Sequence, residues 1–282
     1  MLTEIIDLYD YFHMLRGSAD KGYLTCYARD NYVECLVKRE RPSVLVIPGG
    51  GYEFVSQRES EPIALAYMAN HFNSFVLDYS CAPKTHYPTQ LIEASMAMAY
   101  IRENREKYHL TDKVSAVGFS AGGHLCACLA TIFDDENIIK ALGEERAKSV
   151  RPDAVILSYA VISSGTYTHG GSFNNLCLGD TFLMERLSLE KRVTEKSSPA
   201  FIWHTADDSS VPVENSLLLA SAYANHKVPF ALHIFEKGRH GSSTVDMECY
   251  HLDDMQGFSI DCHKWLQLSV NFLTEHEFVC ND

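Results

Sequence analysis

Three separated segments of the sequence carry side chains that together could transfer an acyl group. Residues 118–122 form a G-x-S-x-G pattern centred on Ser120, and Asp208 and His240 follow it later in the chain. A serine hydroxyl is a weak nucleophile near neutral pH, so it needs a histidine to accept its proton and a carboxylate to orient that histidine. The order serine, acid, histidine therefore predicts Ser120 as nucleophile, with His240 as base and Asp208 as the orienting acid.

The residues around Ser120 predict a strand, a tight turn and a helix. Residues 113–117 are a short β-rich stretch before the pentapeptide, and residues 123–130 favour a helix after it. Such a turn exposes the serine hydroxyl above the sheet edge, and its flanking glycines are needed because side chains there would collide with the neighbouring strand and helix. The start of the helix also directs backbone N–H groups at a reacting carbonyl.

Asp208 and His240 are each expected in a loop that follows a strand. Residues 200–204 are an apolar strand that leads into Asp207 and Asp208, and residues 230–235 are a strand that leads into the glycine-flanked His240. Because the carboxyl ends of parallel strands meet at one edge of a sheet, both loops reach the edge that carries Ser120. Asp207 is adjacent to Asp208 and competes with it for the role of the acid.

A glycine-rich loop supplies the remaining requirement, an oxyanion hole. Residues 48–51 read Pro-Gly-Gly-Gly and follow an apolar strand at 44–47. We expect the backbone N–H groups of Gly50, Gly51 and Ala121 to stabilise the developing oxyanion. A phosphate-binding loop would need Gly-Lys-Ser/Thr after its spacer, and a dinucleotide fingerprint would need G-x-G-x-x-G opening a helix. Neither pattern is present, so we expect no cofactor.

Strand-like and helix-like segments alternate along the chain, which predicts an α/β fold: a mostly parallel, twisted sheet with helices on both faces. We expect one domain over residues 1–282, with the segment 161–198 as an insertion that forms a lid or a wall of the acyl pocket. The expected strands lie at 23–27, 32–37, 44–47, 74–79, 113–117, 154–159, 200–204 and 230–235, the first two forming an antiparallel edge. The expected helices lie at 61–70, 89–108, 123–130, 135–148, 212–225 and 263–278.

Composition narrows the class of protein. The formal net charge of −13 disfavours binding to nucleic acid or to anionic membranes, and no apolar run is long enough to span a bilayer. With no basic and apolar leader at its start and nine scattered cysteines, the chain is expected in the reducing cytoplasm. Cys126 and Cys128 lie two apart on a helix and point to different faces, so we expect no metal site. A homo-oligomer is compatible with the sequence.

Five motifs together resemble an α/β-hydrolase of the esterase/lipase type, most similar to bacterial acetyl-xylan and sugar-ester esterases. They lie at 48–52, 78–83, 118–123, 204–212 and 238–241. In such sequences the acid stands three residues before Val-Pro, which favours Asp208 over Asp207. Members of the hormone-sensitive-lipase branch carry histidine where this chain has Pro48, so substrate details of that branch do not transfer.

The resemblance implies a serine hydrolase of small carboxylic esters, with acetyl or short acyl esters of carbohydrates as substrates. The residues alone indicate only acyl transfer. Two alternatives remain: a peptidase of the prolyl-oligopeptidase type, which shares the H-x-x-x-D-x-x-V-P pattern, and a non-catalytic binding protein of the same fold. For His86, His124, His169 and His204, a structural role is the default interpretation.

Overall fold

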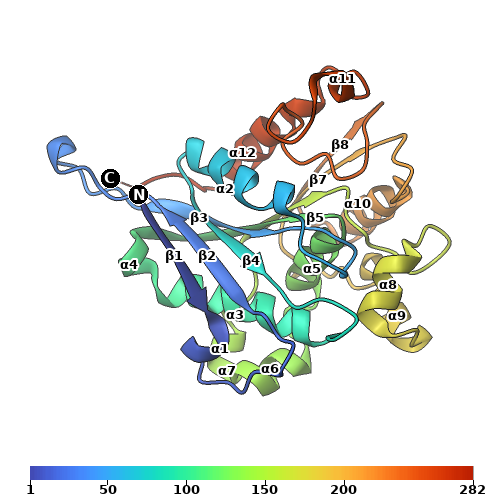
Figure 1. Ribbon diagram of the computed structural model, residues 1–282, viewed down its shortest axis with the longest axis horizontal. Coiled ribbons are helices and arrows are strands. Elements are labelled where there is room, and N and C mark those ends of the chain that lie inside the picture. The colour runs from blue at the N-terminus through green and yellow to red at the C-terminus, as the bar shows by residue number, and fades with distance from the viewer. Residues whose placement is uncertain (282) are drawn as a thin grey trace.

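The computed structural model describes residues 1–281; Asp282, the last residue of the predicted domain, lies outside them. An eight-stranded sheet runs through the molecule in the order β1-β2-β4-β3-β5-β6-β7-β8 (Figure 1). Only β2 runs against the others, so β3 to β8 form a parallel sheet. The strands are β1 (Leu2–Asp7), β2 (Tyr23–Ala28), β3 (Arg41–Ile47), β4 (Asn73–Asp78), β5 (Leu110–Phe119), β6 (Ala154–Ser158), β7 (Ala200–Thr205) and β8 (Phe230–Phe235).

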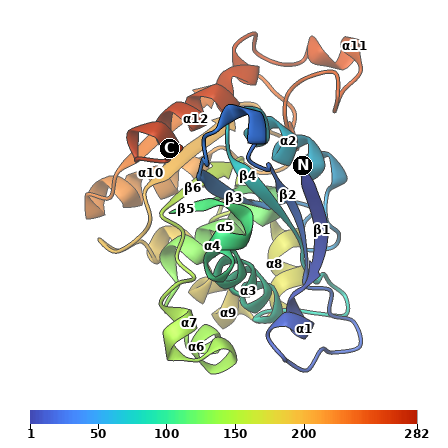
Figure 2. The ribbon, with the colours of Figure 1, turned by 90° about the vertical axis from the view of Figure 1, so that its left-hand side faces the viewer.

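Helices cover both faces of the sheet. Figure 2 shows α2 and α12 on one side of the sheet and α3 and α5 on the other. The helices are α1 (Leu8–Tyr11), α2 (Glu61–Ala69), α3 (Thr89–Glu103), α4 (Arg105–Tyr108), α5 (Ser120–Thr131), α6 (Glu136–Leu142), α7 (Glu144–Ala147), α8 (Gly170–Cys177), α9 (Thr181–Arg186), α10 (Glu214–His226), α11 (Leu252–Met255) and α12 (Trp265–Glu275). This arrangement confirms the predicted α/β-hydrolase fold. Within the described chain, no helix has the length and apolar character needed to cross a bilayer.

Each parallel strand contributes side chains to two separate apolar cores. In β3, Leu45 and Ile47 pack with α3 and α5, whereas Val44 and Val46 pack with α2 and α12. All four side chains are fully buried. Because successive side chains of a strand point to opposite faces, a sheet covered on both faces requires an uninterrupted apolar run. The sequence 44–47 meets that requirement and places the glycine loop directly at the strand's carboxyl end.

The prediction of a strand at 32–37 is wrong. These residues contain a single 3₁₀ turn, Val33–Cys35, and Leu36 follows it in the left-handed region with φ of 53°. Tyr32, Val33 and Leu36 are exposed. The antiparallel edge is formed by β1 and β2 instead, and β2 already pairs with β4 on its other side. No free edge is left beside β2, so the apolar residues of this segment find no partner strand.

A buried carboxylate, Glu93 on α3, ties the chain that follows β4 to the N-terminal region. It accepts hydrogen bonds from the Ser80 backbone N–H at 2.7 Å, the Ser80 hydroxyl at 2.5 Å and the Tyr9 hydroxyl at 3.1 Å. Burial raises the pKa of Glu93 to about 7, against the lowering effect of these hydrogen bonds. The folded protein therefore holds a proton on Glu93 over a pH range in which the unfolded chain has lost it.

We expect Glu93→Gln to remove a pH-dependent part of the folding stability. Since the folded carboxyl has the higher pKa, the wild-type protein loses stability as pH rises from about 4.5 to about 7. At 1.36 kcal/mol per pKa unit, the full effect is about 3 kcal/mol. Urea unfolding of both proteins between pH 5 and 8 measures it, with Glu195→Gln, at an exposed position, as the control. A wild-type-minus-variant difference that stays constant with pH would refute the prediction.

Candidate active site

Ser120 lies at the turn between β5 and α5, as the sequence predicts. It is the first residue of α5, it has a left-handed backbone with φ of 52°, and its side chain is only 7 % exposed. Two residues later, a Cβ atom on Gly122 would lie 2.2 Å from the carbonyl oxygens of Ile47 and Pro48. Only glycine therefore lets the start of α5 pack directly against the end of β3, which brings the serine next to the glycine loop.

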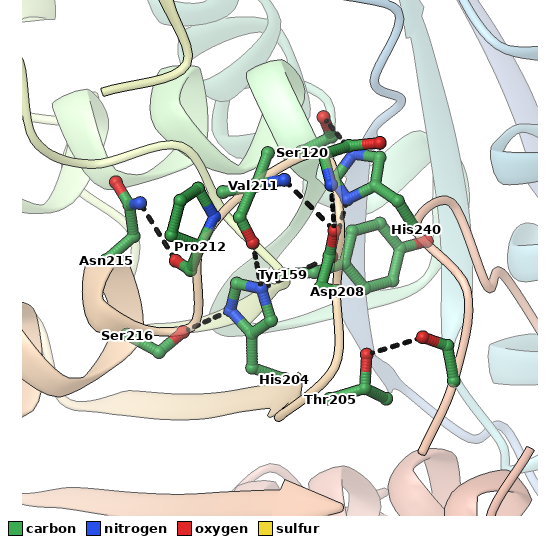
Figure 3. A network of polar contacts seen from close by, with 12 residues as sticks. Ser120, Tyr159, His204, Thr205, Asp208, Val211, Pro212, Asn215, Ser216 and His240 are labelled. Atoms are coloured by element: carbon green, nitrogen blue, oxygen red, sulfur yellow. Dashed lines mark hydrogen bonds and ion pairs between the residues drawn. The ribbon is translucent and has the colours of Figure 1, made fainter. Parts of the chain in front are cut away.

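The structure brings Ser120, His240 and Asp208 together in one line of hydrogen bonds (Figure 3). His240 Nε2 lies 2.8 Å from Ser120 Oγ, and His240 Nδ1 lies 2.7 Å from Asp208 Oδ2. The serine comes from the β5–α5 turn, the carboxylate from the loop after β7 and the imidazole from the loop after β8. These are the distances at which a histidine can take the serine proton while a carboxylate holds its other nitrogen.

Asp208 is a buried carboxylate whose oxygens all have donors. Its Oδ1 accepts from the backbone N–H groups of Ser210 at 2.8 Å and Val211 at 3.0 Å. Burial on its own raises the pKa of Asp208, but hydrogen bonds from His204 and His240 and the charge of His240 outweigh it and hold the pKa below its usual range. The group is therefore ionised at neutral pH, in the form that can orient a histidine.

The neighbouring acid, Asp207, serves a different loop contact. Its Oδ1 accepts from the Gly238 backbone N–H at 2.8 Å, while the Thr205 hydroxyl donates to the Gly238 carbonyl at 3.0 Å. The N–H and the carbonyl of Gly238, two residues before His240, are thus both held by side chains at and just after the end of β7. Of the two acids that compete in the sequence, Asp208 contacts the histidine and Asp207 braces the loop that carries it.

The glycine loop after β3 has a backbone that only glycine accommodates. Gly50 has φ of 124°, and a Cβ atom there would lie 2.1 Å from the Phe54 carbonyl oxygen. The loop is anchored at Pro48, whose carbonyl accepts a hydrogen bond from the Tyr79 hydroxyl at 2.8 Å. Pro48 therefore braces the loop through its backbone carbonyl. The hormone-sensitive-lipase branch, to which the sequence was compared above, carries a histidine side chain at this position.

Three backbone N–H groups beside Ser120 remain available to a ligand. Within residues 1–281, the amides of Gly50 and Gly51 donate to no protein acceptor. Ala121 lies in the first turn of α5, where backbone N–H groups have no partner in the helix. These are the amides that the sequence predicts as the oxyanion hole.

A second buried carboxylate, Glu59, joins the glycine loop to the histidine loop. Glu59 Oε2 accepts from the Gly49 N–H at 2.9 Å, and Oε1 accepts from the Tyr159 hydroxyl at 2.7 Å. The same hydroxyl accepts from the Ser243 N–H at 2.9 Å, and the Tyr159 ring packs edge-on against the His240 ring at 5.1 Å. Sequence reasoning missed this series of contacts because no local pattern indicates that residues 59, 159 and 243 meet.

A cavity of about 270 Å³ opens beside Ser120 and His240. The exposed residues of its lining are Glu53, Phe54, Arg58 and Ser210. His169, from the predicted insertion, also lines it, and burial together with the nearby His240 lowers the pKa of His169. The lining residues are Gly50, Gly51, Glu53, Phe54, Ser56, Arg58, Glu59, Ser120, His169, Ser210, His240 and Gly241.

The insertion at 161–198 contains α8 and α9 and is bonded to the glycine loop. The Asn175 amide on α8 donates to the Gly51 carbonyl at 2.9 Å. His124 on α5 lies 2.9 Å from the Tyr52 hydroxyl through Nδ1 and 2.9 Å from the Leu187 carbonyl through Nε2. Burial lowers the pKa of His124 to about 4, so the ring is neutral at pH 7 and bridges the two segments.

The side chains of the described residues offer no evident metal site. Across residues 1–281, no three His, Cys, Asp or Glu side chains lie together in a way that could hold a metal ion. Cysteines that form free thiols are Cys26, Cys81, Cys126, Cys128, Cys177, Cys249 and Cys262.

Known proteins resemble this chain in sequence. A model of the BD-FAE family matches residues 30–223. Endo-1,4-beta-xylanase B of Butyrivibrio fibrisolvens is 42 % identical over 219 residues, which make up 75 % of this chain and 34 % of that protein. An acetylxylan esterase of Xylanibacter ruminicola is 28 % identical over 241 residues, which make up 81 % of this chain and 46 % of that protein. The chain thus spans less than half the length of these two curated relatives.

A solved structure matches the chain over almost its whole length. The acetyl ester-xyloside bifunctional hydrolase from Caldicellulosiruptor lactoaceticus superposes with a TM-score of 0.80 and 31 % identity, covering 98 % of this chain and 97 % of the other. The family model covers well over half of the chain, and the observed sheet and helix order fits the same fold. The chain therefore belongs to the BD-FAE family of α/β hydrolases.

Proposed function

We propose that this chain is a serine esterase that cleaves small carboxylic esters, with acetyl or other short acyl esters of carbohydrates as its substrates. The observation that carries the proposal is the line of hydrogen bonds from Asp208 through His240 to Ser120, which ends in a cavity beside unused backbone amides. A nucleophile, a base, an orienting acid and an oxyanion hole in one place are the components of acyl transfer.

The relatives support both the acyl group and the carbohydrate part of the proposed substrate. One is an acetylxylan esterase, and another is an acetyl ester-xyloside hydrolase that aligns with nearly the whole of this chain. Four polar residues of the cavity lining, Glu53, Arg58, His169 and Ser210, offer donors and acceptors for the hydroxyl groups of a sugar. A cavity of about 270 Å³ lies near the small end of ligand pockets, which favours a small acyl group.

Acylation begins at Ser120. His240 Nε2 takes the hydroxyl proton as Oγ attacks the ester carbonyl, and Asp208 stabilises the resulting imidazolium through Nδ1–H. The negative oxygen of the tetrahedral intermediate is held by the amides of Gly50, Gly51 and Ala121. His240 then gives its proton to the leaving alcohol oxygen, the C–O bond of the ester breaks, and Ser120 carries the acyl group.

Deacylation repeats these steps with water as the nucleophile. His240 takes a proton from water, the hydroxide attacks the acyl carbonyl, and the same amides hold the second oxyanion. Collapse of this intermediate returns the proton to Ser120 Oγ and releases the carboxylic acid. No oxidant, reductant or metal enters either half of the reaction.

We also propose that the protein resides in a reducing compartment, as the sequence predicts for the cytoplasm. Cys26, Cys126, Cys128, Cys177 and Cys262 are buried free thiols. Burial raises the pKa of Cys126, Cys128 and Cys177 above the usual thiol value, which leaves these side chains protonated and inert. Such thiols act as small apolar core residues in a cytosolic protein.

Ser120→Ala is expected to abolish hydrolysis of p-nitrophenyl acetate and of acetylated xylo-oligosaccharides. The loss in kcat is on the order of 10⁶-fold, because the nucleophile and its base act as one unit. Circular dichroism and the melting temperature check that the variant folds, and a fluorophosphonate probe checks that only the wild-type serine is labelled. Retained turnover in the variant would disprove the mechanism. Failure of the probe on folded wild-type protein would favour a non-catalytic binding protein.

Asp208→Asn and Asp207→Asn form a matched pair. Asp208→Asn lowers kcat by about 10⁴-fold, because an amide no longer fixes the tautomer and charge of His240. Asp207→Asn keeps an oxygen that can accept from the Gly238 N–H, so its kcat is expected within about tenfold of wild type. Steady-state kinetics on p-nitrophenyl acetate separate the two. Equal losses of kcat in the two variants, or a larger loss in Asp207→Asn, would contradict the assignment of Asp208 as the orienting acid.

Substrate preference is expected to fall steeply with acyl length. Among p-nitrophenyl esters, kcat/KM should be highest for acetate and should drop by at least about tenfold at octanoate, because a small cavity cannot bury a long chain. Peptide p-nitroanilides serve as the comparison for the peptidase alternative. Faster cleavage of prolyl anilides than of acetyl esters would support that alternative and overturn the esterase proposal.

A further inference from the structure

A second histidine contacts the carboxylate that orients His240. His204 lies in β7, one residue before the strand ends, and its side chain is fully buried. Its Nε2 lies 3.3 Å from Asp208 Oδ2, the same oxygen that His240 Nδ1 contacts at 2.7 Å. Figure 3 shows the two imidazoles on either side of Asp208. Sequence reasoning assigned His204 a structural role because the identity of its partner depends on the loop after β7.

The contacts of His204 fix where its proton lies. Nε2 faces two acceptors, the Val211 carbonyl at 3.0 Å and Asp208 Oδ2, so it must carry a hydrogen. Nδ1 lies 2.8 Å from the Ser216 hydroxyl at the start of α10. In the neutral ring, Ser216 therefore donates to Nδ1, and the Nε2–H is shared between Val211 and Asp208. The ring is held by three groups from two elements and has one orientation.

Resting on the function proposed above, we infer that His204 is a positioning residue. It fixes the Asp208 carboxylate in the plane in which Oδ2 meets His240, and it limits how strongly that carboxylate attracts the His240 proton.

The distribution of donors on Asp208 explains this role. Oδ1 is held by the Ser210 and Val211 amides, and Oδ2 by the two imidazoles. Without His204, Oδ2 has one donor in a fully buried site, so part of its negative charge is left uncompensated. A carboxylate with fewer donors is more basic and pulls harder on the remaining imidazole proton. It is also freer to rotate away from the line that joins it to Ser120.

Other titratable groups face His240 from several elements. A change in the pH profile of the activity that comes from residue 204 must therefore be separated from the effects of these groups. His169 comes from the insertion, the Tyr159 ring comes from the end of β6, and Glu59 stands behind Tyr159. The Arg58 guanidinium lies beside Gly241, the residue that follows His240. Among the hydrogen bonds and ion pairs within residues 1–281, Asp208 Oδ2 meets His204 and His240, and none of these other groups contacts it. A change at residue 204 therefore acts through Asp208.

The test compares His204→Phe with His204→Gln. Phenylalanine keeps the ring and removes both nitrogens, whereas the glutamine amide can place an N–H near the position of Nε2. For p-nitrophenyl acetate we expect His204→Phe to lower kcat by about 10- to 100-fold with little change in KM. The acid limb of its kcat/KM profile should move to higher pH by on the order of half a unit. His204→Gln should recover most of both effects.

Tyr67→Phe is the control for losing a buried hydrogen bond far from this site, because Tyr67 on α2 bonds Ser269 on α12. It should lower the melting temperature and leave the acid limb in place. If His204→Phe fails to fold, Ser216→Ala replaces it, since it frees the His204 ring while keeping the imidazole. An acid limb that stays at the wild-type pH in His204→Phe, or in Ser216→Ala where His204→Phe does not fold, would overturn the inference and leave the esterase proposal standing.

A spectroscopic readout separates failure of the inference from failure of the proposed function. The low-field proton NMR line of His240 Nδ1–H reports its bond to Asp208 without any substrate. We expect this line to move further downfield in His204→Phe and to return towards the wild-type position in His204→Gln. A shifted line in a protein whose wild type hydrolyses no ester would reject the function and keep the coupling. An unshifted line in an active enzyme would reject the coupling.

Discussion

The site depends on one close approach between backbone segments at the carboxyl edge of the sheet. The end of β3 and the start of α5 touch at Gly122, where any Cβ atom would meet two carbonyl oxygens at 2.2 Å. This contact places Ser120 in a left-handed turn and sets the glycine loop beside it. A side chain at this position would push the helix away from the strand and separate Ser120 from the amides of Gly50 and Gly51.

Two buried carboxylates hold the loops that meet at this edge. Asp208 fixes the histidine ring and is itself held by two amides and a second imidazole, while Glu59 links the Gly49 amide to Tyr159 and so to the loop after His240. Both groups are satisfied by several donors, which offsets the cost of burying a charge. The arrangement of Ser120, His240 and Asp208 is thus fixed because buried polar side chains connect loops that the sheet only brings near one another.

Local patterns were sufficient wherever a short segment decides its own structure. The apolar runs at 44–47 and 154–158 become buried parallel strands, the run at 230–235 becomes the half-buried edge strand β8, and the Gly-Phe-Ser-Ala-Gly pentapeptide becomes a strand–turn–helix. The pattern at 32–37 misled because β1 takes the place beside β2 that the prediction gave to this segment, and β4 takes the other side. Which segment pairs with β2 is decided by the whole sheet and not by the local sequence.

By itself the sequence determined the fold class, the places of Ser120, Asp208 and His240 after their strands, and the glycine loop, because each depends on residue type and on spacing along the chain. It also favoured Asp208 over Asp207, but only the tertiary structure showed that Asp208 contacts His240 and Asp207 contacts Gly238. It also decided that Glu59, Tyr159 and His204 belong to the site. Their partners lie far away in sequence or across a loop, and hydrogen bonds between such groups are set by distance in space.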